Sequence, residues 1–267
     1  MRKDARMQEN PLILIVNDDG ITAPGLRALT DVVRPMGKVV VVAPESSKSG
    51  SSHAVTVHQP LRLDKIHQEP GFEKYGCTGT PVDCVKLAFK VVLGRRPDLL
   101  VSGINHGSNS SINILYSGTM AAVFEGAMAG VPSIGFSVLS SRIDADFSAA
   151  RIWSKRIIRR IMKNGLPEGV CLNVNIPHIP MGQISGVRVC RQARALWQED
   201  FDVRRDPGGR EYYWMKGIFN RISEGDDTDE WALENHYISV VPVHFDFTHY
   251  PALDLIRNWD FARETNV

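Results

Sequence analysis

Two adjacent carboxylates, Asp18 and Asp19, are the first residues in this chain whose types suggest chemistry. They follow Leu12–Val16, an unbroken apolar run rich in β-branched residues, which is typical of a strand buried on both faces of a parallel sheet. Neighbouring side chains on a strand point to opposite faces, so both carboxylates serve one site only if the chain leaves the strand near Asn17. Gly20 and the turn residues after it favour that exit. The alternative is a plain turn followed by a helix cap.

Two further predicted strands also end in polar residues. Residues 38–43 lead into a loop that contains Ser49, and residues 97–104 lead into Asn105. Ligands of open α/β sheets bind beyond the carboxyl ends of the strands, where these side chains meet. Carboxylate, hydroxyl and amide oxygens are hard ligands that suit Mg²⁺, Mn²⁺ or Ca²⁺ better than Zn²⁺. The predicted ligands of one divalent cation are Asp18, Asp19, Ser49 and Asn105.

A phosphate site is predicted beside this cation. A helix rich in small residues begins at Ser117, and a helix N-terminus offers free backbone N–H groups to an anion. A simple Ser or Thr cap is the alternative. The candidate phosphate-binding residues are Asn105, Gly107, Ser117, Gly118 and Thr119. A divalent cation beside bound phosphate is the apparatus of phosphate-ester hydrolysis, in which metal-bound water attacks. We expect Asp19 to bridge the ion and Asp18 to orient the water.

Two neighbouring side chains have open roles. His106 either protonates the leaving oxygen or is an ordinary surface or packing residue. Lys48 either meets a substrate anion or is a solvated loop lysine.

The rest of the chain predicts the elements that position these residues. Helices are expected at 24–36, 80–94, 118–129 and 147–162, with strands at 73–77, 132–138 and 171–176, and residues 54–66 alternate like one or two strands. Buried positions of the helix at 80–94 include Val91. Strand–helix–strand order predicts an α/β fold: a Rossmann-like, mostly parallel sheet flanked by helices.

The character of the sequence changes near Ile184. Strand-like pieces and a closing helix predict a β-rich C-terminal appendage with a hairpin arm, whose aromatic residues are Tyr212, Tyr213, Trp214 and Phe219. We expect residues 1–183 to form the metal- and phosphate-binding domain and residues 184–267 to form an arm that contacts a second subunit, with packing on its own domain as the alternative.

Composition and charge limit the classes of partner that the chain is expected to bind. The chain has 267 residues and a net charge of +1. With so little net charge, no long-range electrostatic attraction to a nucleic acid polymer or an anionic membrane is expected. The N-terminus lacks the apolar core of a signal peptide, and no stretch approaches a membrane span. The four cysteines show no CxxC spacing and predict reduced thiols in the cytoplasm.

Four blocks of the sequence, in order, resemble the SurE (survival protein E) nucleotidase family: NDDGITAPGL, VVAPESSKSGSS, GTPVDCVKLA and VSGINHGSNSSINILYSGTMAAVFEG. Weaker similarity continues through LNVNIP to VVPVHFDFT. The resemblance implies hydrolysis of nucleoside 5′-monophosphates to nucleoside and phosphate, with 3′-monophosphates and short polyphosphates as further candidate substrates. It also implies one divalent cation, Mg²⁺ or Mn²⁺ before Ca²⁺, held by the four ligands named above, and a homodimer or tetramer formed through C-terminal elements.

Two competing functions follow from the residues. One is a phosphatase whose carboxylate nucleophile, at the end of the first strand, forms an aspartyl-phosphate. The other is a non-catalytic nucleotide-binding module, against which stands the absence of GxGxxG and GxxxxGK[ST] motifs.

Overall fold

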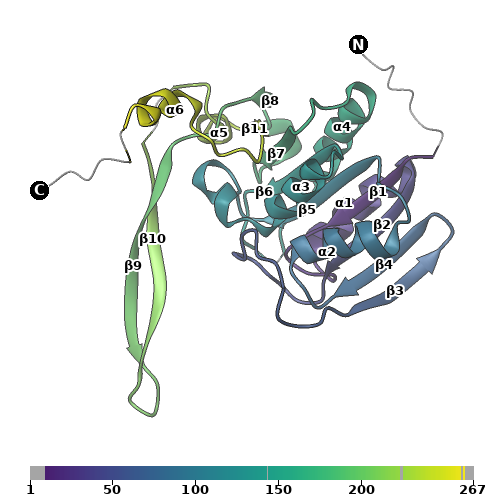
Figure 1. Cartoon of the computed structure of the whole chain (residues 1–267), viewed down its shortest axis with the longest axis horizontal. Helices are drawn as coiled ribbons and strands as arrows, with labels where there is room; N and C mark the ends of the chain where they lie inside the picture. The colour runs from purple at the N-terminus through teal and green to yellow at the C-terminus, as the bar shows by residue number, and fades with distance from the viewer. Residues whose placement is uncertain (1–9, 143, 223–224, 260, 262–267) are drawn as a thin grey trace, which may run out of the picture.

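The core of the protein is one nine-stranded sheet in a computed structural model that describes residues 10–142, 144–222, 225–259 and 261 (Figure 1). Its six central strands run parallel. At one edge β3 runs antiparallel to β4, and at the other β11 runs antiparallel to β7 and parallel to the edge strand β8. In order across the sheet, the strands are β3 (Leu63–Glu69), β4 (Phe72–Cys77), β2 (Lys38–Pro44), β1 (Leu12–Val16), β5 (Leu99–His106), β6 (Ser133–Val138), β7 (Cys171–Ile176), β11 (Tyr237–Val243) and β8 (Gly186–Val189).

Helices cover both faces of this sheet. α1 (Pro24–Val33) and α4 (Ser148–Asn164) pack on one face, and α2 (Pro81–Leu87) and α3 (Gly118–Met128) pack on the other. In β1, Ile13 joins the first apolar cluster and Leu14 the second, because successive side chains alternate. The predicted α/β fold, with a strand buried on both faces at residues 12–16, is confirmed.

Small residues let α3 approach the sheet closely. A Cβ atom placed on Gly126 would lie 2.2 Å from Oγ of Ser133 in β6, and one on Gly135 would lie 2.5 Å from Sδ of Met120 in α3. Any larger side chain at either position would push the helix outward. This close packing fixes the N-terminus of α3 relative to the strand ends.

The helix at 80–94 differs from the expectation at its C-terminal end. Its start is as predicted, since Thr80 and Asp83 form a reciprocal capping box. α2 ends at Leu87, however, and residues Ala88–Val92 form a π-helical turn. The wider turn rotates the following side chains, so Val91 is 66% exposed and its predicted burial is wrong.

Of the one or two strands expected at 54–66, one forms, and it makes an antiparallel hairpin with β4. Only β3 forms there, and residues 54–62 belong to no strand. This stretch runs over the surface, where polar contacts such as the Thr56 N–H to Asp83 replace strand pairing.

The C-terminal region combines a protruding arm with additions to the main sheet. β9 (Ala195–Arg205) and β10 (Glu211–Arg221) pair antiparallel and extend away from the body (Figure 1). β8 and β11 join the central sheet, so strands from both sides of residue 184 share one sheet, and a division into two domains there stays a prediction. The remaining helices are α5 (Asp229–Glu234) and α6 (Tyr250–Arg257). Among the described residues, no helix is long and apolar enough to span a bilayer.

Candidate active site

The chain leaves β1 in a turn that joins the end of this strand to the loop after β2. Asn17 is buried, and its amide donates a hydrogen bond to the Gly20 carbonyl. Gly20 has a φ of +104° and lies against the backbone of Ser46, so a side chain here would be strained and crowded. The Lys48 N–H donates to the Asp18 carbonyl at 2.7 Å. This bond brings the loop that carries Ser49 to the carboxylates.

Asp18 is the buried carboxylate of the site, with only 3% of its surface exposed. The Thr119 hydroxyl, in the first turn of α3, donates a hydrogen bond to Asp18 Oδ1. Burial is the main cause that raises the pKa of Asp18 to about 6, the nearby Asp19 charge adds to this, and the Thr119 bond opposes it. A carboxylate so disfavoured in its charged form gains most from a cation beside it.

Gly118 leaves the space that Asp18 needs. A Cβ atom on Gly118 would lie 2.8 Å from Asp18 Cβ and 3.1 Å from Asp18 Oδ2. The first position of the helix therefore accepts only glycine, because any side chain there would displace the carboxylate. Ser117 caps the same helix, accepting a hydrogen bond from the Met120 N–H through its Oγ.

At the end of β5, Asn105 donates a hydrogen bond from its amide nitrogen to the Gly107 carbonyl at 2.9 Å. Its amide oxygen can still accept a hydrogen bond or bind a cation, since no described residue donates to it. Gly107 has a φ of +92°, and its N–H donates to the Val138 carbonyl at 3.0 Å. Asp19 accepts hydrogen bonds from the backbone N–H and ring Nδ1 of His106.

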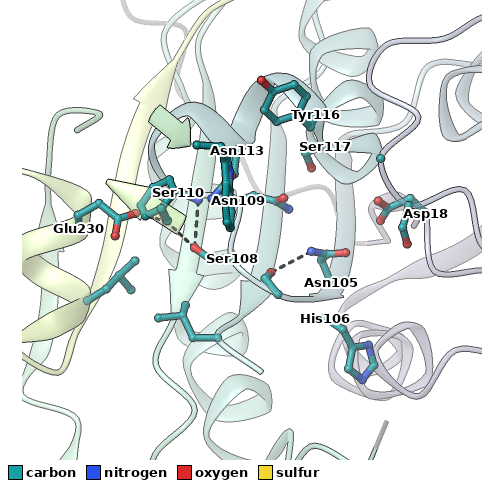
Figure 2. Close-up of a pocket in the computed structure, with 17 residues that line it drawn as sticks. Asp18, Asn105, His106, Ser108, Asn109, Ser110, Asn113, Tyr116, Ser117 and Glu230 are labelled. Atoms are coloured by element: carbon teal, nitrogen blue, oxygen red, sulfur yellow. Dashed lines mark hydrogen bonds between the residues drawn. The ribbon is translucent and has the colours of Figure 1, made fainter. Parts of the chain in front are cut away.

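A cavity of about 490 Å³ opens between these strand ends and the C-terminal region (Figure 2). Of the residues predicted from sequence, Asp18, Ser49, Asn105, Gly107 and Ser117 line it, as does His106. Asp19, Gly118 and Thr119 lie behind its wall, each in contact with a lining residue. Lys48 does not line the cavity; its backbone N–H holds the loop.

The residue types at the strand ends suit a hard divalent cation. Two carboxylates, one amide oxygen and one hydroxyl supply oxygen ligands, as Mg²⁺ and Mn²⁺ prefer. No cluster of three or more His, Cys, Asp or Glu side chains suited to a metal occurs in the part of the chain that the structure describes. Oxygen donors of this kind, in place of the nitrogen and sulfur ligands typical of zinc sites, are what favours Mg²⁺ or Mn²⁺ here.

Sequence reasoning missed the far side of the cavity. It is formed by side chains from the loop after β5, from the base of the arm and from α5: Asn113, Trp197, Phe219, Glu230 and Leu233. Tyr116 also lines the cavity, beside Ser117 (Figure 2). Figure 2 shows Asp18 on one side and Glu230 on the other, with Ser108 between them.

Contacts from the C-terminal region hold the loop after β5 in place. The Ser110 hydroxyl donates to Glu230 Oε1, and the Ser111 N–H donates to Asp229 Oδ2 at 2.8 Å. Burial raises the pKa of both Asp229 and Glu230. The acidic residues between Asp226 and Glu230 were the available sequence signal for this side of the cavity. Their pattern is equally typical of a solvated loop.

Comparisons with known proteins identify the relatives of this chain. Residues 13–199 match the family model described as Survival protein SurE. The chain is 51% identical over 254 residues to a Flavobacterium psychrophilum protein named 5′-nucleotidase SurE. The aligned region covers 95% of this chain and 99% of that protein. A protein of the same name from Christiangramia forsetii is 52% identical, covering 94% and 98%. The crystal structure titled Sure Protein from Aquifex aeolicus superposes with a TM-score of 0.80 at 38% identity, covering 92% of this chain and 98% of that one.

Proposed function

The chain belongs to the SurE family, and from that membership we propose how its active site works. Relatives that match over nearly their whole length are named 5′-nucleotidase SurE. The protein is a nucleotidase that hydrolyses nucleoside monophosphates to nucleoside and phosphate. The structural observation that carries the site assignment is that Asp18, Asn105 and Ser117, from three separate elements, line one cavity.

We propose that Asp18, Asp19, Ser49 and Asn105 hold one divalent cation, Mg²⁺ or Mn²⁺. A bound cation of this kind polarises phosphate oxygens and lowers the pKa of a bound water. Burial of Asp18 supports the ligand role, because its charge needs a nearby countercharge. Thr119 holds Oδ1 of Asp18 with its hydroxyl and so fixes the orientation of this carboxylate.

The start of α3 is proposed to bind the phosphate. Ser117 Oγ accepts the helix-capping bond, so its hydroxyl hydrogen stays available for a phosphate oxygen. The backbone N–H groups of Gly118 and Thr119 at the start of α3 border the same region, and the helix N-terminus favours negative charge. Gly107 is proposed to shape the loop beside the phosphate, because its own N–H donates to the Val138 carbonyl. Asn105 faces this space from the end of β5. Together these groups would orient the phosphorus for in-line attack by water.

The testing experiment measures phosphate release from a panel of nucleoside 5′- and 3′-monophosphates and short polyphosphate. The assay is run with EDTA and then with added Mg²⁺ or Mn²⁺. Release that stops with chelator and returns with metal supports the proposed cation. Release that is insensitive to chelator would move the chemistry away from Asp18 and Asp19. A covalent adduct trapped with a fluoride-based phosphate mimic would instead favour the aspartyl-phosphate route.

Two further features are proposed. The arm is proposed to form a homodimer or tetramer, because Trp214 and Ile218 are 61% and 67% exposed on it. The cytoplasm is the proposed compartment, since all four cysteines are buried free thiols.

A further inference from the structure

The cavity has two chemically different ends. The cation and phosphate groups line one end, and aromatic rings from the base of the arm line the other. Trp197 in β9 and Phe219 in β10 face each other in the hairpin register, with ring centroids 5.2 Å apart and an interplanar angle of 56°. They form the aromatic wall, a name used below for these two rings.

A hydrogen bond joins the aromatic wall to the segment that leads into the proposed phosphate site. Trp197 Nε1 donates to Asn113 Oδ1 at 2.8 Å, and Asn113 lies in the 3₁₀ turn Ser111–Tyr116 that leads directly into Ser117 and α3. The wall is therefore positioned by the same segment that positions the phosphate site. Trp197 is still 39% exposed, so part of its ring stays open to a ligand.

The aromatic wall ends where the cavity ends. On the same face of the hairpin, Phe201 and Met215 follow further out along the arm. Neither lines the cavity, although they are 54% and 70% exposed. Only the innermost aromatic pair of this apolar face is therefore placed to meet a molecule bound at Asp18 and Ser117.

A nucleoside monophosphate has the same polarity as the cavity, with a dianionic phosphate at one end and a flat aromatic base at the other. The cavity volume of about 490 Å³ is ordinary for small-molecule sites, which span roughly 300–1,000 Å³. We propose that Trp197 and Phe219 contact the base of the substrate, so that the root of the arm is a specificity-determining wall. This inference rests on the proposed function.

The chemistry of the wall predicts which substrates benefit. Aromatic side chains can contact any of the bases because every base has a π face. A larger base buries more area against them. Both purine and pyrimidine nucleotides are therefore accepted, with purine nucleotides bound more tightly. A substrate without a base, such as ribose 5-phosphate, keeps the phosphate contacts and loses those of the wall.

The test compares Phe219→Ala with the wild type on adenosine 5′-monophosphate and ribose 5-phosphate. The measured ratio is kcat/KM for adenosine 5′-monophosphate divided by kcat/KM for ribose 5-phosphate. Loss of one stacking ring is expected to lower this ratio roughly ten-fold, mostly by raising KM for the nucleotide. Trp197→Leu is the second variant, and Phe201→Ala is the matched control on the same face. Calorimetric titration with adenosine measures the base contact without turnover.

A lower ratio and weaker adenosine binding in Phe219→Ala, with the Phe201→Ala ratio unchanged, support the inference. An unchanged ratio in both wall variants, or an equal loss in Phe201→Ala, overturns it. If the wild type hydrolyses neither substrate, the proposed function fails instead, and adenosine binding still decides the role of the wall.

Discussion

Asp19 and His106 form a pair in which one carboxylate oxygen, Asp19 Oδ2, lies 3.2 Å from both the backbone nitrogen and ring Nδ1 of His106. The pair ties the end of β1 to the end of β5. With Nδ1 donating to the carboxylate, Nε2 is the remaining ring nitrogen, and it is buried without a partner among the described residues. The ring also packs edge-on against Phe147, at 5.1 Å between centroids. Through Nδ1 and its backbone N–H, His106 has a positioning role toward Asp19.

His106→Gln is expected to lower kcat about ten-fold by loosening Asp19. Because the variant removes orientation and not a proton donor, the loss should be similar for a nucleotide and for p-nitrophenyl phosphate, whose leaving group needs no proton. Steady-state kinetics with both substrates measures this. A loss of 100-fold or more confined to the nucleotide would instead show general acid catalysis.

Asp18→Asn is expected to weaken Mg²⁺ or Mn²⁺ binding and to lower activity at least 100-fold, because the main carboxylate ligand is lost. The fold should stay nearly intact, since the amide is isosteric and a costly buried charge is removed. Calorimetric metal titration and thermal unfolding measure the two effects. Undiminished phosphatase activity would contradict the metal assignment.

Gly118→Ala tests the space beside Asp18. The added methyl group would lie 2.8 Å from Asp18 Cβ, so the carboxylate must move and activity should fall roughly 10- to 100-fold. Gly182→Ala is the control: it lies in the 3₁₀ turn Met181–Gln183, and its added Cβ would meet nothing within 4 Å. Equal activity in the two variants would argue against this packing constraint. Metal titration of both variants locates the defect.

Asp229→Asn is expected to lower the free energy of unfolding by about 1–3 kcal/mol, because Asp229 accepts hydrogen bonds from the N–H groups of Ser111 and Ala193. An amide nitrogen cannot accept one of these bonds.

The cost of Asp229→Asn should depend on pH. Burial raises the pKa of Asp229 from its ordinary value of 3.8, so the folded state binds this proton more tightly than the unfolded state. The stability that protonation adds is fully present below 3.8 and is lost as pH rises through the folded value. The difference between wild type and variant should therefore shrink from pH 4 to pH 7 in urea unfolding. A difference that grows with pH would contradict the raised pKa.

Combined Trp214→Ser and Ile218→Ser substitution tests the arm. Both side chains lie on the hairpin face opposite Phe219 and are exposed in the single chain, so the stability of the fold should change little. Loss of their apolar surface should lower the average mass seen by sedimentation at a given concentration. An unchanged mass would leave the arm without a role in assembly.

Local pattern determined most of the α/β layer. The β-branched runs at 12–16 and 38–43, the cap at Thr80 and the small-residue helix after Ser117 each carry a short-range signal, because burial on both faces and helix capping depend on neighbouring residues. The carboxyl ends of parallel strands meet at one edge, so Asp18, Ser49 and Asn105 were predictable as a group.

Contacts between distant segments decided the rest. β9 shows no alternation between buried and exposed residues, because both faces of a two-stranded arm are open and its charged and apolar residues are exposed alike. The addition of β8 and β11 to the sheet depends on pairing across the fold. Trp197, Phe219 and Glu230 reach the cavity only through the return of the chain after residue 190, and no local spacing encodes that return. The sequence thus determined the oxygen ligands at the strand ends, whereas tertiary packing decided what encloses the other end of the site.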